Sequence, residues 1–346
     1  MEVSKQPAPL IISSSPHIHC GSTISMAMRD VLLALLPATL ASLWFFGPDA
    51  LVIILACCLS AVIFEAICQK IMQRPLTIGD GSALLTGLLL ALCLPPAFSP
   101  LIAVFGSFCA IVIGKQVFGG LGNNIFNPAH IGRAILLASM PQQMTTWTKP
   151  LAWDSSLVWG NPAKVDAITT ATPLVLMRQM ESNWQSGNIS ALDTTLDQLP
   201  SLWQLFIGST AGSLGETSAL ALLIGGLFLI WRGHIDWRIP FYYLTTVFVL
   251  TGTYAWFFQY ELWFPVYHLL SGGLIIGAFF MATDWVTSPL TKRGRIIFAV
   301  GLGFLTALIR LRGGYVEGVC YSILIMNMLT PLIDRYVTNA PFGGDK

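Results

Sequence analysis

Ten apolar stretches run through this chain of 346 residues. A helix needs about 20 mostly apolar residues to cross a bilayer, and we predict spans over residues 30–46, 50–69, 82–95, 97–114, 127–140, 215–231, 240–258, 265–283, 295–310 and 316–333. Charged residues make up only 10% of the chain, whereas a soluble domain carries about 25%. The sequence therefore predicts an all-α polytopic membrane protein. Its net charge of +1 excludes the basic field that nucleic-acid binding requires.

The lysines and arginines predict the orientation, because cytoplasmic loops are enriched in them. With a cytoplasmic N-terminus, 13 of the 18 basic residues fall on the cytoplasmic side. Three of the other five lie in the single long loop, residues 141–214. We therefore predict that both termini are cytoplasmic and that the long loop is outside. The remaining two, Arg310 and Arg312, are interpreted as anchors whose side chains extend toward the lipid headgroups.

The long loop divides the spans into two sets of five. We predict a cytoplasmic segment over 1–29, a first five-helix half over 30–140, the outer loop over 141–214, a second five-helix half over 215–333 and a cytoplasmic tail over 334–346. Because five is odd, a duplicated unit would have opposite topology in the two halves, which is an inverted repeat. Weak similarity between residues 79–96 and 268–284, at the third span of each half, supports such a duplication.

The outer loop contains a segment that combines an acid, threonines and a proline: Asp166, Thr169, Thr170, Ala171, Thr172 and Pro173. The residue before a proline is disfavoured in helical φ/ψ. Thr172 is therefore predicted to lie on an extended stretch, with its hydroxyl accessible to another protein. The alternative is a turn that enters a helix capped near Thr172.

This segment resembles Asp-x-x-[Ser/Thr]-x-Ala-Thr, the signal read by a periplasmic flavin transferase that esterifies FMN through its phosphate to the last threonine. Flanking blocks resemble the family that contains the D subunit of the Rnf electron-transport complex and the B subunit of the Na⁺-translocating NADH:quinone reductase. These blocks, spread over nearly the whole chain, cover residues 15–38, 79–96, 114–133, 166–174, 268–295 and 311–336. The TTAT of this chain departs from the SGAT common in the second protein, but Asp166 and the final Ala-Thr are kept.

The resemblance implies covalent FMN on Thr172, with Asp166, Thr169, Thr170 and Ala171 as the segment recognised by the periplasmic flavin transferase. It also implies a bacterial inner-membrane complex that exchanges electrons between ferredoxin and NAD⁺ while moving Na⁺ or H⁺. The partners would be the A, B, C, E and G subunits of the Rnf complex. This chain would be one subunit of that oxidoreductase and not a complete enzyme.

The main alternative is a solute or ion transporter without a redox cofactor, because inverted halves with broken third helices suit one. The segment DAITTATPL distinguishes the two, since a transporter has no use for it. No cysteine spacing fits a structural zinc site, and we predict no metal site.

Three acidic residues in or beside predicted spans are further candidates, because ionisable groups at membrane depth are often functional. For Glu65, the nearby Lys70 favours a solvated or paired carboxylate. Asp80 and Asp284 occupy corresponding places beside the short, glycine-rich third spans. They are candidates to contact a second, non-covalent flavin such as riboflavin, or a coupling ion. Capping of a helix is the alternative role.

Overall fold

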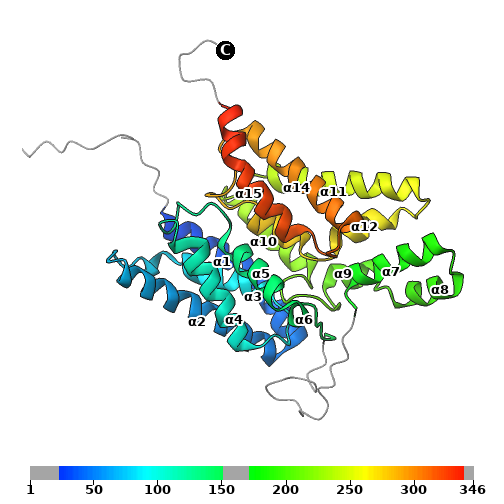
Figure 1. Cartoon of the computed structure of the whole chain (residues 1–346), viewed down its shortest axis with the longest axis horizontal. Coiled ribbons are helices and arrows are strands. Elements are labelled where there is room, and N and C mark those ends of the chain that lie inside the picture. Colours follow the sequence, from blue (N-terminus) through cyan, green and yellow to red (C-terminus); the bar gives the residue numbers. More distant parts are fainter. Residues whose placement is uncertain (1–22, 151–170, 339–346) are drawn as a thin grey trace, which may run out of the picture.

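The computed structural model describes residues 23–150 and 171–338, and their regular structure is helical throughout. The first half contains α1 (Ile24–Phe46), α2 (Pro48–Ile71), η1 (Ile78–Asp80), α3 (Ser82–Leu92), α4 (Pro100–Phe108), the π-helix η2 (Cys109–Gln116) and α5 (Pro128–Ser139). The long loop contributes α6 (Pro141–Met144), α7 (Pro173–Ser186), α8 (Ile189–Gln198) and α9 (Leu202–Ile207). Figure 1 shows α7 and α8 projecting beside the ends of α11 and α12.

The second half contains α10 (Ala219–Trp231), α11 (Arg238–Phe257), α12 (Trp263–Leu270), α13 (Leu274–Ile276), the π-helix η5 (Gly277–Met281), α14 (Lys292–Arg312) and α15 (Val319–Tyr336). Each of the ten predicted spans coincides with one of these helices or with a helix pair. By length and composition, α1, α2 and α14 are long and apolar enough to cross a membrane. A fourth is formed by α12 with α13 and η5, which bend by 65° at their break. The predicted all-α, multi-pass membrane fold is confirmed.

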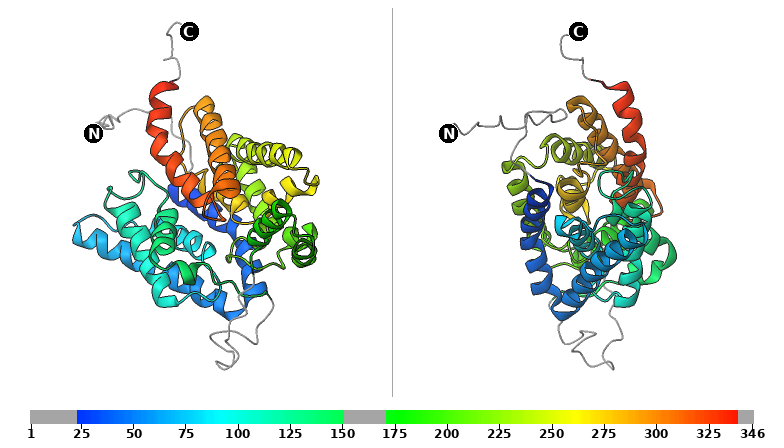
Figure 2. Two further views of the ribbon diagram at one scale, coloured as in Figure 1. Left: turned by 45° about the vertical axis from the view of Figure 1, so that its right-hand side comes forward. Right: turned by 90° about the vertical axis from the view of Figure 1, so that its left-hand side faces the viewer.

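The bundle has two ends. Near the beginning of α1, the carboxylate of Asp30 contacts Arg232 and His234 in the loop after α10, each at 2.7 Å. Trp285, after η5, donates to the carbonyl of His234. We call this end the termini side. At the opposite end, Arg178 of α7 donates to the Gly313 carbonyl after α14, and we call that end the loop-domain side. Figure 2 shows the two ends in further views.

The two halves repeat the same helix pairings. Helix α2 packs against α3 and α4, and α11 packs correspondingly against α12 and α14. Across the boundary between the halves, α1 packs against α10, and α5 against α15. Such matching pairings are expected wherever one five-helix unit occurs twice, and the inverted topology of the two halves stays a prediction.

Two helices end inside the bundle, where their last carbonyls have no water to bind. At the end of α3, the backbone amides of Leu214 and Gly215 donate to the carbonyls of Leu94 and Leu92, at 3.0 and 2.7 Å. The loop before α10 therefore provides hydrogen-bond donors for the last carbonyls at the end of α3. At the end of α12 the donor is a side chain, that of Arg310, which is described below.

Close packing of α1 against α10 depends on a glycine. A Cβ atom at Gly225 would lie 1.9 Å from the Ala34 carbonyl oxygen, whereas one at Gly252 on α11 would lie 4.0 Å from its nearest neighbours, two atoms of Pro265. Small residues allow membrane helices to approach this closely.

We predict that Gly225→Ala lowers the free energy of unfolding by about 1–3 kcal/mol, because the new methyl group overpacks the contact between α1 and α10. Gly252→Ala is the matched control. It should stabilise the protein by up to about 1 kcal/mol, since alanine is the better helix former. Thermal unfolding of the purified protein in detergent measures both. Equal effects at the two positions would contradict the close contact.

Candidate functional site

Thr172 is the N-cap of α7, and its backbone is extended (φ −69°, ψ 157°). Its Oγ1 accepts a hydrogen bond of 3.4 Å from the Val175 amide. The extended conformation was predicted, and so was the alternative of a capped helix; both describe the local structure. The predicted accessibility of the hydroxyl is not found, because Thr172 is only 8% exposed. Ala171 is exposed, and Asp166, Thr169 and Thr170 lie outside the described residues.

A small cavity of about 10 Å³ adjoins Thr172. Its walls come from the start of α7, the loop before α10, the break between α12 and α13, and the segment after α14; they include Thr172, Leu174, Glu216, Ser271, Gly272 and Glu317. The volume is about that of one water. Buried Glu216 Oε1 and Ser271 Oγ have no hydrogen-bond partner there. The site therefore brings both halves and the long loop together around a few unsatisfied polar atoms.

A buried charge cluster borders this cavity. Arg133 of α5 forms an ion pair with Glu317, which follows α14. Its guanidinium also lies 3.7 Å from Glu216, which precedes α10. Because the three side chains come from three different segments, the cluster links the two halves at the loop-domain side.

Arg310 differs from its predicted role as a headgroup anchor. It lies 5% exposed in the last turn of α14, and its guanidinium donates to the carbonyls of His268 and Ser271, at 2.5 and 3.1 Å. The prediction was wrong because α12 ends inside the bundle, so its free carbonyls attract the guanidinium inward. Arg312 is exposed.

Helix α7 is fixed to the membrane helices by polar contacts along its length. Arg178 donates to the carbonyls of Gly313 and Gly314. Further along, Glu181 lies 3.9 Å from Nε2 of His268 on α12. Burial raises the pKa of Glu181 to about 7. These contacts hold the Thr172 end of α7 against the break in the second half.

A larger cavity of about 260 Å³ opens on the termini side, between the two halves. Both π-helices contribute to its walls: Lys115 from η2, and Phe279 and Phe280 from η5. Asn124 and Asn127 contribute polar groups, and most of the remaining lining is apolar. Irregular helices of this kind often occur at functional sites, and an apolar cavity with a few convergent polar groups is typical of a cofactor site.

The two aspartates proposed to contact a second flavin or an ion lie differently with respect to this cavity. Asp284 lines it, and its carboxylate accepts from the Val286 amide and the Thr287 hydroxyl. Asp80 is not part of the lining and instead accepts from the amide and hydroxyl of Ser82 at the start of α3. Both carboxylates thus cap turns, and only Asp284 also faces the cavity. Within residues 23–150 and 171–338, no three His, Cys, Asp or Glu side chains gather as a metal site requires.

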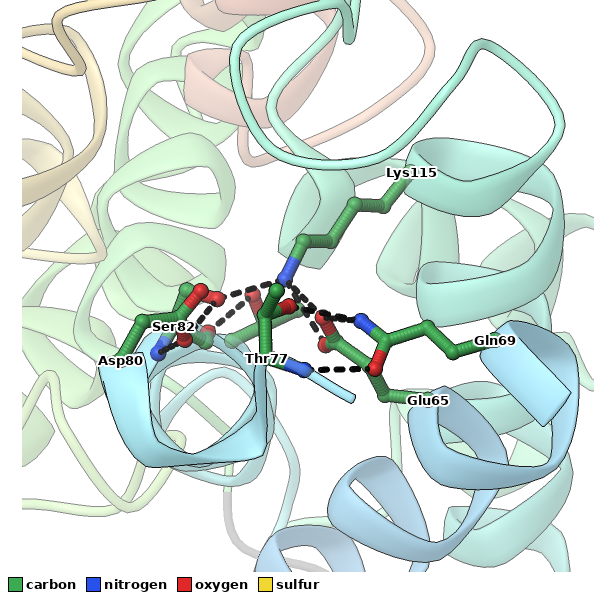
Figure 3. Close-up of polar contacts among 7 residues, drawn as sticks. Glu65, Gln69, Thr77, Asp80, Ser82 and Lys115 are labelled. Carbon is green, nitrogen blue, oxygen red and sulfur yellow. Dashed lines mark hydrogen bonds and ion pairs between the residues drawn. The ribbon is translucent and has the colours of Figure 1, made fainter. Parts of the chain in front are cut away.

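Glu65 is paired, but its partner is Lys115 and not the predicted Lys70 (Figure 3). The Lys115 ammonium donates to both Glu65 oxygens, at 2.7 and 2.9 Å, and to Ser82 Oγ at 2.7 Å. Gln69 also donates to Glu65, at 3.1 Å. Glu65 and Lys115 are each 1% exposed, so this is a fully desolvated ion pair beside the larger cavity.

Sequence reasoning missed Lys115, Arg133 and Arg310. Lys115 and Arg310 lie at the ends of apolar stretches, which is also the pattern of an ordinary headgroup anchor, and Arg133 lies in the middle of the short predicted span 127–140. A buried pair is distinguished from an anchor only by its partner. For Lys115 and Arg133 the partners, Glu65 and Glu317, are more than 40 residues away in the sequence.

These features define an all-α, multi-pass membrane protein in which two sets of helices have matching pairings and a cavity lies at each end of the boundary between them. A profile of the NQR2, RnfD, RnfE family matches residues 11–343. The chain belongs to this family.

Curated relatives agree with this assignment over nearly their full length. The D subunit of the proton-translocating ferredoxin:NAD(+) oxidoreductase complex of Clostridium ljungdahlii is 48% identical over 332 residues, which are 96% of each chain. The D subunit of the Na(+)-translocating ferredoxin:NAD(+) oxidoreductase complex of Acetobacterium woodii is 44% identical over 338 residues, 97% of this chain and 96% of its own. The D subunit of the ion-translocating oxidoreductase complex of Stutzerimonas stutzeri is 43% identical over 333 residues, 93% of each.

We predict that Lys115→Met lowers the free energy of unfolding by about 3–5 kcal/mol, because it leaves the Glu65 carboxylate buried without a partner. Adding Glu65→Gln should recover much of this loss, since no uncompensated charge then remains. Lys70→Met, at an exposed lysine on the same side, is the control and should change little. Thermal unfolding of the purified proteins in detergent measures the free energy change for all three variants. A Lys115→Met effect as small as that of Lys70→Met would contradict the buried pair.

Proposed function

We propose that this chain is the D subunit of an ion-translocating ferredoxin:NAD⁺ oxidoreductase complex and that it carries FMN esterified to Thr172. The observation that carries the proposal is the similarity to the D subunits of such complexes over nearly the whole chain. Those two relatives are named for different ions, H⁺ and Na⁺. The proposal therefore commits to ion translocation by the complex and not to one ion.

Only the start of α7 suits the phosphate end of FMN, because the adjoining cavity is small and is lined by the carboxylates of Glu216 and Glu317. A phosphodiester on Oγ1 would lie at the N-terminus of a 14-residue helix, where the helix dipole favours a negative charge. The cavity beside it is too small for a tricyclic ring. The flavin ring would therefore lie outside the cavity, on the loop-domain side, where the cofactor of a partner protein can approach. When bound, FMN supplies the electron transfer; the chain holds its phosphate end.

The orientation of the chain belongs to the same proposal. With both termini cytoplasmic, the loop-domain side faces the periplasm across the bacterial inner membrane. A periplasmic flavin transferase would then recognise Asp166, Thr169, Thr170 and Ala171. The other partners would be the A, B, C, E and G subunits of the Rnf complex.

A second, non-covalent flavin is proposed for the larger cavity on the termini side. Its volume of about 260 Å³ is just below the range of small-molecule sites, about 300–1,000 Å³. The apolar walls suit a flat aromatic ring, and Asn124, whose Oδ1 has no hydrogen-bond partner, offers an acceptor for its polar edge. Asp284 is the acidic residue placed to contact such a ligand.

We predict that the chain, co-expressed with its flavin transferase, gives a fluorescent flavin band after SDS denaturation. Thr172→Ala should abolish the band, because no hydroxyl remains to form the ester. Thr145→Ala, at an exposed threonine of the same long loop, is the matched control and should leave the band unchanged.

An absent wild-type band, with the transferase active on a control substrate, would contradict covalent FMN. The timing of transfer provides a further check. Because Thr172 is buried and caps α7, transferase added to the folded chain should label it more slowly than transferase present during synthesis. Equal rates would show that the folded chain already exposes the hydroxyl.

We predict that Ala27→Phe lowers the amount of non-covalent flavin that acid precipitation releases from the purified chain. Ala27 lines the larger cavity from α1, so an aromatic ring there would occupy the space of the ligand. Leu33→Phe, on the exposed face of α1, is the control and should release the wild-type amount. Equal release from both variants would place the non-covalent flavin elsewhere or exclude it.

A further inference from the structure

The cavity beside Thr172 is surrounded by side chains that carry oxygen atoms. The carboxylates of Glu216 and Glu317 line it, and within the part of the chain that the structure describes no lysine, arginine or histidine does. Its buried hydroxyl groups belong to Thr172, Thr210, Thr217 and Ser271. The volume of about 10 Å³ is close to that of one water. The wall therefore offers acidic and hydroxyl oxygens to a single small occupant.

Two of these side chains are buried with an oxygen atom that has no hydrogen-bond partner. Ser271 is 1% exposed and Glu216 is 8% exposed, and the atoms without a partner are Ser271 Oγ and Glu216 Oε1. Glu216 Oε1 faces the break between α12 and α13, because a Cβ atom at Gly273 would lie 3.2 Å from it. Burying a polar atom without a partner is unfavourable. These two oxygens therefore indicate a ligand that brings them positive charge.

The charges around the cavity leave it acidic. Arg133 forms an ion pair with Glu317 and lies 3.7 Å from Glu216, so one guanidinium serves two carboxylates. Arg310 donates to backbone carbonyls and is not part of the wall. Burying a carboxylate is unfavourable unless a counter-charge compensates it. A monovalent cation in the cavity would give Glu216 the counter-charge that Arg133 gives to Glu317.

The available ligands and their place in the fold suit such a cation. Carboxylate, hydroxyl and carbonyl oxygens are the ligands of hard cations. In membrane proteins with broken helices, ions bind beside the unwound segment of the break. Here Ser271 and Gly272, between α12 and α13, form part of the wall. One carboxylate without a close counter-charge matches one positive charge, which favours a monovalent over a divalent ion.

We propose that this cavity binds one dehydrated monovalent cation of the size of Na⁺, with Glu216 and Ser271 as ligands. Glu216 supplies the negative charge, and the Ser271 hydroxyl supplies a neutral oxygen from the break between α12 and α13. The inference does not rest on covalent FMN. It goes beyond the proposed function, which assigns ion translocation to the complex and no ion to this chain.

A buried water is the alternative occupant. A water would donate hydrogen bonds to Glu216 Oε1 and Ser271 Oγ, and its binding would not depend on Na⁺. A ligand that binds only the folded state raises the stability of that state as its concentration rises. The two occupants are therefore distinguished by how the Tm responds to Na⁺ at constant ionic strength.

The experiment uses the purified full chain in detergent, produced without the flavin transferase, so that its result does not depend on covalent FMN. Its Tm is measured in NaCl and in N-methyl-D-glucamine chloride at equal ionic strength, for the wild type, Glu216→Gln, Ser271→Ala and Ser213→Ala. Ser213→Ala is the matched control. Ser213 Oγ is also buried without a partner, three residues before Glu216, but Ser213 does not line the cavity.

We expect Na⁺ to raise the Tm of the wild type and of Ser213→Ala in a saturable way. Glu216→Gln should lose this shift, because the amide carries no charge. Ser271→Ala should need a several-fold higher Na⁺ concentration for half of the shift, because one ligand is missing. A wild-type Tm that is equal in the two salts would show that water alone occupies the cavity, and this would overturn the proposal.

A full shift in Glu216→Gln would place the cation elsewhere and would overturn the proposal as well. If Glu216→Gln does not fold, the two serine variants decide, and equal half-effect concentrations of Na⁺ in Ser271→Ala and Ser213→Ala would contradict the site. The flavin band of the co-expressed chain is measured on a separate sample. Its absence would refute the proposed flavin attachment and leave the cation site standing.

Discussion

Helix ends inside the hydrocarbon region must find hydrogen-bond partners within the protein, and the architecture around Thr172 depends on this constraint. The end of α3 takes its donors from the backbone of Leu214 and Gly215. The end of α12 takes its donors from the guanidinium of Arg310. In both cases a distant segment must come to the helix end. The loop that reaches α3 and the end of α12 also line the cavity beside Thr172.

The same constraint places charge inside the membrane domain. Arg310 satisfies carbonyls, and it brings a positive charge into the bundle. Lys115 joins the π-helix η2 to α2 and α3 through Glu65 and Ser82. Such pairs contribute little net stability compared with apolar packing, but removing one partner is costly. They therefore specify one arrangement of irregular helices at the boundary between the halves, where both cavities lie.

Much of the fold was predictable from the sequence, because the signals are local. The ten apolar stretches matched helices, since hydropathy is summed over neighbouring residues. The proline after Thr172 predicted the extended residue at the start of α7. The interpretation of Glu65 as a paired group was correct, but its predicted partner was not. Lys70 is close in sequence, whereas Lys115 is brought to Glu65 by the packing of α2 against η2.

The sequence by itself determined the class of protein, the number of apolar segments, the family resemblance and the threonine that we propose for flavin attachment. These depend on composition, short-range pattern and motif. Only the tertiary structure decided that Thr172 is buried, that Arg310 turns inward and that Glu65 is joined to Lys115. It also decided that Asp284 lines a cavity while Asp80 does not. The reason is that burial and pairing depend on which segments meet in space, and a chain with two broken helices brings together residues that no local pattern connects.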